Sequence, residues 1–575
     1  MTGISEFKHL FPIDSIQKVC ELFEEQLRSE KEPDLALFSI IVGAVENNLT
    51  NIKNSEKDVN LTNNKFIKIK FPSVEWDEIK SLNERFESLM RGGVENKLLN
   101  GEFATRDLIK RVADIVWNSL TRSYYKDRAH LQSIYSFLTG NKLDCFGVAF
   151  AVTAGCQVLG KQDVHLALSE DHAWVVFGKD GKETAEVTWH GKGNEDKRGR
   201  SVGDGVSARS WLYVAGKPVI CTRIMELAAL VSSINPTLTP TVDVHEVAQM
   251  QHRLLWLLYD HGHLDAYPMA LGNLGDLDEY MKISDTTSDA QESVFQVISE
   301  PARPDSAALY SQAIRSSQTH YEDRHVYPYT FQGGYYHRHK MYKEAFHAWA
   351  CAGDVIRHYN YSRDDEEIYK EFSEIANELI PQLMKTESSG HSARSILKDP
   401  ECFASLLRFY DGICKWEEGS QTPILHIGWA KPLVSTISKF DAEVRAQVNI
   451  ICNSESDEGK EETKDFVSST SEKKEGQDVK DKDKWNNNAD NTEMTVREQL
   501  TAAVNSRPRV TLYSHKMAAL KPLLLAERLN THALQLQLTA QSQLQRPLAP
   551  AKRRNDDEQN QCAQSARGKR ARRER

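Results

Sequence analysis

The segment Asp171-His172-Ala173-Trp174-Val175-Val176-Phe177 decides what fold we expect at the centre of the chain. Its β-branched and aromatic residues predict a buried strand with a histidine near its start. Cys145 precedes His172 by 27 residues, and Glu186 follows it by 14. A cysteine nucleophile needs a base beside it, and the base needs an acceptor that orients it. Cys145, His172 and Glu186 are therefore one possible set of parts for a thiol site.

The segments around this strand predict an α+β unit in which helices precede strands. We expect helices over 108–121 and 145–159, and strands over 164–168, 172–177 and 184–189. Asp144 can cap the helix that begins at Cys145, where the exposed amides and the helix dipole favour a thiolate. The strand that carries His172 is similar to the histidine strand of papain-type and transglutaminase-type thiol sites.

The turn at Asp180-Gly181 allows two hairpin registers. A two-residue loop sets Val175 opposite Glu186 and turns His172 to the other face of the sheet. A three-residue loop with the glycine left-handed sets Trp174 opposite Glu186. Only this second register brings His172 and Glu186 to one face, because a slip of one residue reverses the face of every side chain. The sequence permits both registers.

Composition predicts a mostly globular protein of several packed units. The chain has 575 residues, of which 40% are hydrophobic and 9% aromatic, so about three or four units are expected. It lacks the run of about 18 apolar residues that would span a bilayer, and its N-terminus lacks a basic region followed by an apolar one. We expect neither membrane insertion nor secretion. The nine cysteines form no CxxC pair, which predicts a reducing compartment and no structural zinc. We expect no cofactor and no metal.

Helical and strand patterns alternate towards the N-terminus. Residues 15–48 have apolar positions at helical spacing and predict two helices. Residues 66–71 alternate with period two, which predicts a half-exposed hairpin strand.

Beyond about residue 225 the pattern is helical for more than two hundred residues. One segment there fits the tetratricopeptide template, with small and aromatic residues at the template positions: Gly333, Tyr336, Ala345, Trp349 and Ala352. A single repeat cannot bury its own apolar face, so we expect several degenerate repeats to stack into a concave, peptide-binding surface.

The end of the chain changes composition twice. Residues 453–509 have too few apolar residues to offset chain entropy and predict a disordered insert, whereas helical periodicity returns over 510–545. The tail 546–575 has two basic clusters that are typical of a nuclear import signal, and that could also contact DNA without sequence preference. Their residues are Lys552, Arg553, Arg554, Lys569, Arg570, Arg572 and Arg573.

Several longer segments resemble the menin family of nuclear scaffolds and tumour suppressors, as a divergent, invertebrate-like member. The resemblance covers about 5–452 and 508–545. Its most specific segments are Trp117-Asn118-Ser119-Leu120, Tyr125-Lys126-Asp127-Arg128-Ala129-His130, the stretch 166–174 ending in Asp171-His172-Ala173-Trp174, Trp189-His190-Gly191-Lys192-Gly193-Asn194, Tyr267-Pro268-Met269-Ala270-Leu271-Gly272-Asn273-Leu274, Asp365-Glu366-Glu367-Ile368-Tyr369-Lys370-Glu371-Phe372 and Tyr410-Asp411-Gly412-Ile413-Cys414-Lys415-Trp416.

The resemblance implies a mostly α, α+β architecture in seven regions. These are an N-terminal helical and β-hairpin region (1–106), a transglutaminase-like domain (107–224), a tetratricopeptide-like helical palm (225–385), a C-terminal helical region (386–452), the disordered insert (453–509), a returning C-terminal helix (510–545) and the basic tail (546–575).

The resemblance also implies a nuclear adaptor without catalytic activity. Its expected partners are the N-terminal motif of a mixed-lineage-leukaemia-type histone H3 lysine 4 methyltransferase, a Jun-family transcription factor and lens-epithelium-derived growth factor. The peptide-binding residues carried over by position are Ser169, Asp171, His172, Ala229, Ser232, Ser233, Tyr267, Met269, Asn273, Tyr327, Phe331, Trp349, Glu371 and Glu374. Four of them, Ala229, Ser232, Ser233 and Phe331, depart from the vertebrate pattern.

Two classes of function therefore follow from the sequence. One is the peptide-binding adaptor. The other is a thiol hydrolase or acyltransferase that uses Cys145, His172 and Glu186, because the chain retains a thiol at the position of a nucleophile.

Overall fold

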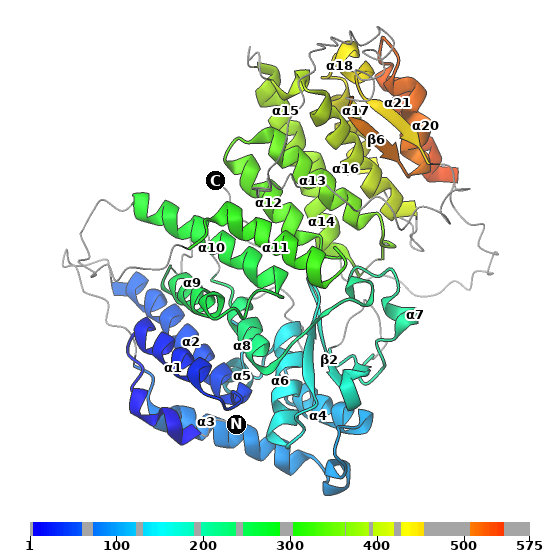
Figure 1. Ribbon diagram of the computed structural model, residues 1–575. Coiled ribbons are helices and arrows are strands. Elements are labelled where there is room, and N and C mark those ends of the chain that lie inside the picture. The colour runs from blue at the N-terminus through cyan, green and yellow to red at the C-terminus, as the bar shows by residue number, and fades with distance from the viewer. Residues whose placement is uncertain are drawn as a thin grey trace, which may run out of the picture. The chain divides into compact units, whose positions relative to one another are not determined.

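The computed structural model describes residues 4–59, 73–121, 130–188, 197–236, 245–287, 303–362, 364–389, 395–418, 427–453 and 507–544. Within these ranges helices dominate and strands are few (Figure 1), which confirms the predicted mostly helical α+β class. The chain separates into two compact units. The first takes in Met1–Met341 and His358–Tyr369, and the second Tyr342–Arg357 and Lys370–Pro547.

The first unit begins with helices around an apolar core. A short 3-10 helix (Ile4–Leu10) leads into α1 (Ile16–Arg28), α2 (Leu35–Val59) and α3 (Trp76–Gly93). Ser15 caps α1 by accepting a hydrogen bond from the amide of Lys18 at 3.3 Å. α1 and α2 confirm the two helices predicted over 15–48, whereas the strand predicted over 66–71 lies outside the described residues.

The helices α4 (Arg106–Ser119), α5 (Ile134–Gly140) and α6 (Cys145–Val158) come next, and a small antiparallel sheet packs against α4 and α6. Its strand order is β3-β2-β1-β4, with bounds His165–Leu168, Ala173–Phe177, Glu183–Ala185 and Val219–Ile220 for β1 to β4. Every residue of α6 from Gly147 onward is buried, as expected for a helix that is apolar all round. The predicted helices and strands are thus confirmed, although β3 ends at Ala185 rather than near residue 189.

The hairpin between β2 and β3 has the register of the three-residue loop. Val175 pairs with Ala185, and Gly181 is left-handed with φ of +62°. Continued by one residue, this pairing sets Trp174 opposite Glu186. The loop therefore directs His172 and Glu186 to the same face.

Further helices follow in the described part of the first unit, after the short α7 (Asp204–Ser207). They are α8 (Arg223–Ser232), α9 (His245–Asp260), α10 (Pro268–Thr287), α11 (Ser306–His320) and α12 (Tyr327–Arg338). α10 and α11 approach closely, because a methyl group on Gly275 would lie 3.0 Å from the ring of Tyr310. α11 in turn packs against α12.

The second unit is built around two helices, α13 (Tyr342–Ile356) and α16 (Pro400–Glu418). Two glycines let their backbones meet: a methyl group on Gly412 would lie 2.1 Å from the carbonyl oxygen of Gly353. α14 (Glu366–Glu374) enters this unit, and α15 (Ile380–Ser389), α17 (Ile427–Ile437) and α18 (Ala442–Ala446) follow in it.

The residues that fit the tetratricopeptide template lie in two different units. Gly333 and Tyr336 lie on α12 in the first unit, whereas Ala345, Trp349 and Ala352 are buried on α13 in the second. Within its own unit α13 packs against α16, which is distant in the sequence. The predicted repeat pairing, like the boundaries of the seven regions, stays a prediction.

The returning segment differs from its prediction. The single helix expected over 510–545 is wrong: the structure has a strand, β6 (Arg509–Leu512), and two helices, α20 (His515–Leu524) and α21 (Thr531–Leu544). β6 pairs in parallel with β5 (Asn449–Cys452). The second helix is separate because Asn530 caps its first turn, accepting from the amide of Ala533 at 3.0 Å. The predicted insert lies largely outside the described residues.

Candidate thiol site and predicted peptide-binding residues

Cys145 is the first residue of α6, and the helix is capped as the sequence predicts. The carboxylate of Asp144 accepts a hydrogen bond from the amide of Gly147 at 2.7 Å. Cys145 itself is only partly buried, although the helix is buried from Gly147 onward. The thiol therefore stands at the positive end of a helix dipole and remains accessible in part.

His172 is held by a tight turn just before β2. The hydroxyl of Ser169 accepts hydrogen bonds from the amides of His172 at 3.0 Å and Asp171 at 3.4 Å, and the amide of Ser169 donates to the carbonyl of His172 at 2.9 Å. The imidazole is buried. Its Nδ1 lies 3.3 Å from the sulfur of Cys145, so the base contacts the thiol directly.

Glu186 orients the imidazole from the far side. Its Oε2 lies 2.8 Å from Nε2 of His172 and also accepts from the hydroxyl of Tyr213 at 2.9 Å. Its Oε1 accepts from the amide of Thr188 at 3.0 Å and from the Thr188 hydroxyl at 2.8 Å. With both oxygens engaged, the carboxylate has a fixed position, and the order Cys145, His172, Glu186 is that of a thiol triad.

The charges of these three groups support one another. Burial opposes the charged form of His172, but the negative charges of Glu186 and Cys145, with their hydrogen bonds, outweigh it and raise the pKa of His172 to about 10. Burial likewise opposes the charged form of Glu186, yet the positive charge and hydrogen bond of His172 hold its pKa below the ordinary value. The imidazole of His172 and the carboxylate of Glu186 therefore stabilise each other's charged forms.

Aromatic rings enclose the imidazole. The ring of Trp174 stacks on His172 with a centroid distance of 5.8 Å, and the ring of Tyr213 meets His172 edge-on at 5.5 Å. Trp174 is 1% exposed, and its indole Nε1 has no hydrogen-bond acceptor among the described residues. The base is therefore packed between two rings, and the indole N–H of Trp174 stays buried.

Several predicted peptide-binding residues of the first unit lie on or beside α8 and α10, and two of them contact each other. The side-chain amide of Asn273 donates to the carbonyl of Ser232 at 3.0 Å. Ser233 donates its hydroxyl to the carbonyl of Leu230 at 2.7 Å. Tyr267 is nearly buried and Met269 is partly buried, whereas Ala229 is fully buried, which places its methyl group behind the surface.

A buried carboxylate ties the turn of His172 to α12. Oε1 of Glu170 accepts from the amides of Val326 at 2.7 Å and Tyr327 at 2.6 Å, and Oε2 accepts from the indole of Trp211 at 2.7 Å. The ring of Tyr327 stacks on Phe331 with a centroid distance of 5.4 Å. Ser169, Asp171 and His172 are therefore fixed to the helix that carries Tyr327 and Phe331.

The remaining predicted residues belong to the second unit. Trp349 is buried on α13, where its ring meets Phe346. Glu371 and Glu374 are partly exposed near the end of α14, three residues apart and so on one face of the helix. The basic residues of the tail lie outside the described residues.

Comparison with known proteins identifies the family. The Menin family model matches residues 3–506 and 498–567. The chain belongs to the menin family. The menin-family chain is also similar to a solved structure described as "Crystal structure of menin reveals the binding site for Mixed Lineage Leukemia (MLL) protein". The identity is 43%, the match covers 92% of this chain and 99% of the other, and the TM-score is 0.70.

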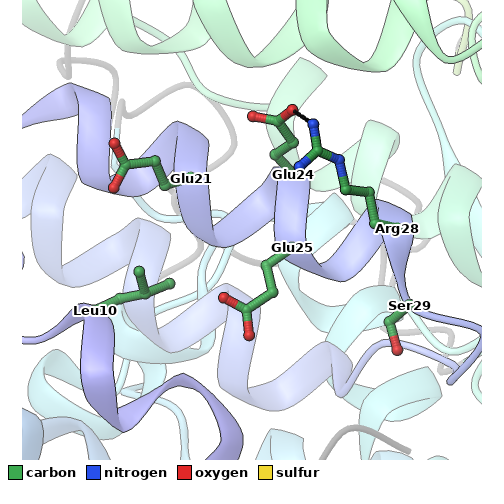
Figure 2. A pocket seen from close by; sticks show the side chains of 6 residues that line it. All are labelled: Leu10, Glu21, Glu24, Glu25, Arg28 and Ser29. Atoms are coloured by element: carbon green, nitrogen blue, oxygen red, sulfur yellow. Dashed lines mark hydrogen bonds and ion pairs between the residues drawn. The ribbon is translucent and has the colours of Figure 1, made fainter.

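The menin-family chain also has an open hollow of about 400 Å³ along α1 (Figure 2). It is lined by the carboxylates of Glu21, Glu24 and Glu25, and an ion pair joins Glu24 to Arg28. None of the predicted site residues lines it. Among the described residues no group of three or more His, Cys, Asp or Glu is arranged to hold a metal ion, and no helix is long and apolar enough to cross a membrane.

Two residues of this menin-family site were missed by reasoning from sequence. Tyr213, which donates to Glu186, lies in an irregular segment that no hydrophobic period singles out. Glu170 sits beside Asp171 in the quoted stretch, but nothing in the sequence shows that it bonds to amides more than 150 residues away. A carboxylate this deeply buried has its pKa raised to about 7 by desolvation, against the lowering effect of its hydrogen bonds.

Proposed function

We propose that this chain is a scaffold that binds the N-terminal segment of a mixed-lineage-leukaemia-type histone H3 lysine 4 methyltransferase. One observation carries the proposal: the chain is 43% identical, along nearly its whole length, to a menin whose crystal structure is described as revealing the binding site for the MLL protein. Identity at this level over 99% of the other chain supports a shared mode of binding.

The chemistry of the predicted residues suits a basic, aromatic-bearing peptide. Tyr327 and Phe331 supply stacked aromatic surface within the first unit. Glu371 and Glu374 supply two carboxylates that arginines of a peptide can engage with two hydrogen bonds each. Apolar walls with a few convergent polar groups are what peptide-binding pockets generally use.

The finer parts of the proposal follow from the family resemblance. We propose that the same residues take a Jun-family segment, that lens-epithelium-derived growth factor joins the complex, and that the assembly acts in the nucleus on chromatin and transcription. The basic clusters of the tail would supply nuclear import, and also weak contact with DNA. The part of the chain that carries α6 and the β2–β3 hairpin would be a transglutaminase-like domain.

A binding titration tests the scaffold directly. A fluorescent peptide with the N-terminal methyltransferase sequence should raise its anisotropy saturably when the full chain is added, and an unlabelled copy should displace it. A scrambled peptide of the same composition should bind far more weakly, because charge alone does not align the peptide's side chains with the groups of the site. Equal binding of the two peptides would reject a specific site.

A further inference from the structure

We propose that Cys145, His172 and Glu186 form a working thiol site that takes acyl groups from esters or amides onto the Cys145 sulfur. This activity goes beyond scaffolding and does not depend on it. The sequence left the geometry open, since only one of two hairpin registers brings the parts together. The structure has that register, with 3.3 Å from sulfur to Nδ1 and 2.8 Å from Nε2 to the carboxylate.

The surroundings of the triad are those of a nucleophile rather than of a structural cysteine. The other thiols near the core, Cys156, Cys221 and Cys414, are buried among apolar neighbours, and burial raises the pKa of each. Cys145 differs in position, because it begins a helix, is partly exposed and touches an imidazole. Reactive thiols are found in such partly exposed, electropositive positions.

The site also has donors for the oxygen of an acyl group. The amides of the first turn of α6, at Cys145 and Phe146, have no acceptor four residues earlier within the helix. N–H groups fixed in place before the reaction stabilise the oxyanion that forms when a thiolate attacks a carbonyl.

The reaction balances with these groups alone. The thiol proton passes to Nδ1 of His172, and the thiolate forms a C–S bond to the carbonyl carbon. The C–O bond of an ester or C–N bond of an amide breaks, and the leaving group takes the proton back from Nδ1. Water or an amine then attacks the thioester, giving its proton through His172 to the sulfur as the C–S bond breaks. Glu186 acts as a positioning residue that holds the imidazole.

The test compares thiols within one sample of the full chain. With p-nitrophenyl acetate at neutral pH, peptide mass spectrometry should find the acetyl group on Cys145 well before it appears on Cys452, which is the exposed cysteine of the described residues. Release of p-nitrophenol should show a burst that Cys145→Ala removes and Cys452→Ala leaves unchanged. His172→Gln should slow acylation of Cys145 by about a hundredfold or more, the usual contribution of a general base.

The comparison of thiols stays decisive even if a variant fails to fold, because it uses the wild-type chain. Acetylation of Cys145 no faster than that of Cys452 would overturn the proposal. An unchanged rate in a folded His172→Gln protein would also overturn it, since the thiol would then react without its base. Peptide binding is measured separately and is expected to survive Cys145→Ala, so failure of the thiol proposal is distinguishable from failure of the scaffold proposal.

Discussion

Gly412→Ala is expected to destabilise the second unit by at least about 3 kcal/mol, a loss typical of severe overpacking. The added methyl group would lie 2.1 Å from the carbonyl oxygen of Gly353, and 2.5 Å and 2.7 Å from its carbonyl carbon and Cα. These are backbone atoms, which cannot rotate aside like the end of a flexible side chain. α13 and α16 would have to separate, and the loss of packing would far exceed the gain in helix propensity from alanine.

Two further Gly→Ala variants show whether the loss of stability depends on the room available for the added methyl group. Gly353→Ala meets the backbone of Phe409 and Arg408 at 3.0 to 3.2 Å and should cost less than Gly412→Ala. Gly92→Ala lies within α3 and meets nothing within 4 Å, so it should stabilise the first unit by up to about 1 kcal/mol. Thermal and urea unfolding followed by circular dichroism would check the order. A Gly412→Ala protein that unfolds like wild type would refute the close packing.

Reversing the charge of Glu371 and Glu374 is expected to weaken binding of the methyltransferase peptide at least a hundredfold. The proposal pairs these carboxylates with arginines of the peptide, so the double change to lysine replaces attraction with repulsion. Losing a charge-assisted contact and adding a like charge costs about 3 kcal/mol or more. Both residues are partly exposed on α14, and lysine is a good helix former, so the fold should tolerate the change.

The matched control carries the same change in net charge at another place. Glu78 and Glu84 are exposed on α3 and are not among the predicted peptide-binding residues. Glu78→Lys/Glu84→Lys should bind the peptide nearly as tightly as wild type in the same anisotropy titration. Equal weakening by both double variants would show that only the overall charge matters, which would remove Glu371 and Glu374 from the proposed site.

The triad shows which features of the site could be predicted from the sequence and which could not. The residue types, the order along the chain and the cap by Asp144 could all be predicted, because caps and periods are local signals. The register could not, since Asp180-Gly181 fits loops of two and of three residues. Long-range hydrogen bonds, such as that from Tyr213 to Glu186, left no local signal.

The prediction for the C-terminal part of the second unit was wrong for the same kind of reason. β5 and β6 pair across about 60 residues, from Asn449 to Arg509, so neither strand has a partner in its own neighbourhood. Two strands of four residues each are too short for a clear period. Once the chain returns, Asp411 accepts from the amides of Tyr513 at 2.8 Å and Ser514 at 3.0 Å, which fixes the segment through contacts that only the folded structure provides.

The most direct test of the central claim, that this menin-family chain is a peptide-binding scaffold, is a crystal structure with the methyltransferase peptide bound. We expect the peptide to contact residues of the predicted set, with its basic groups against Glu371 and Glu374. A peptide seated instead in the acidic hollow of α1, away from every predicted residue, would contradict the account.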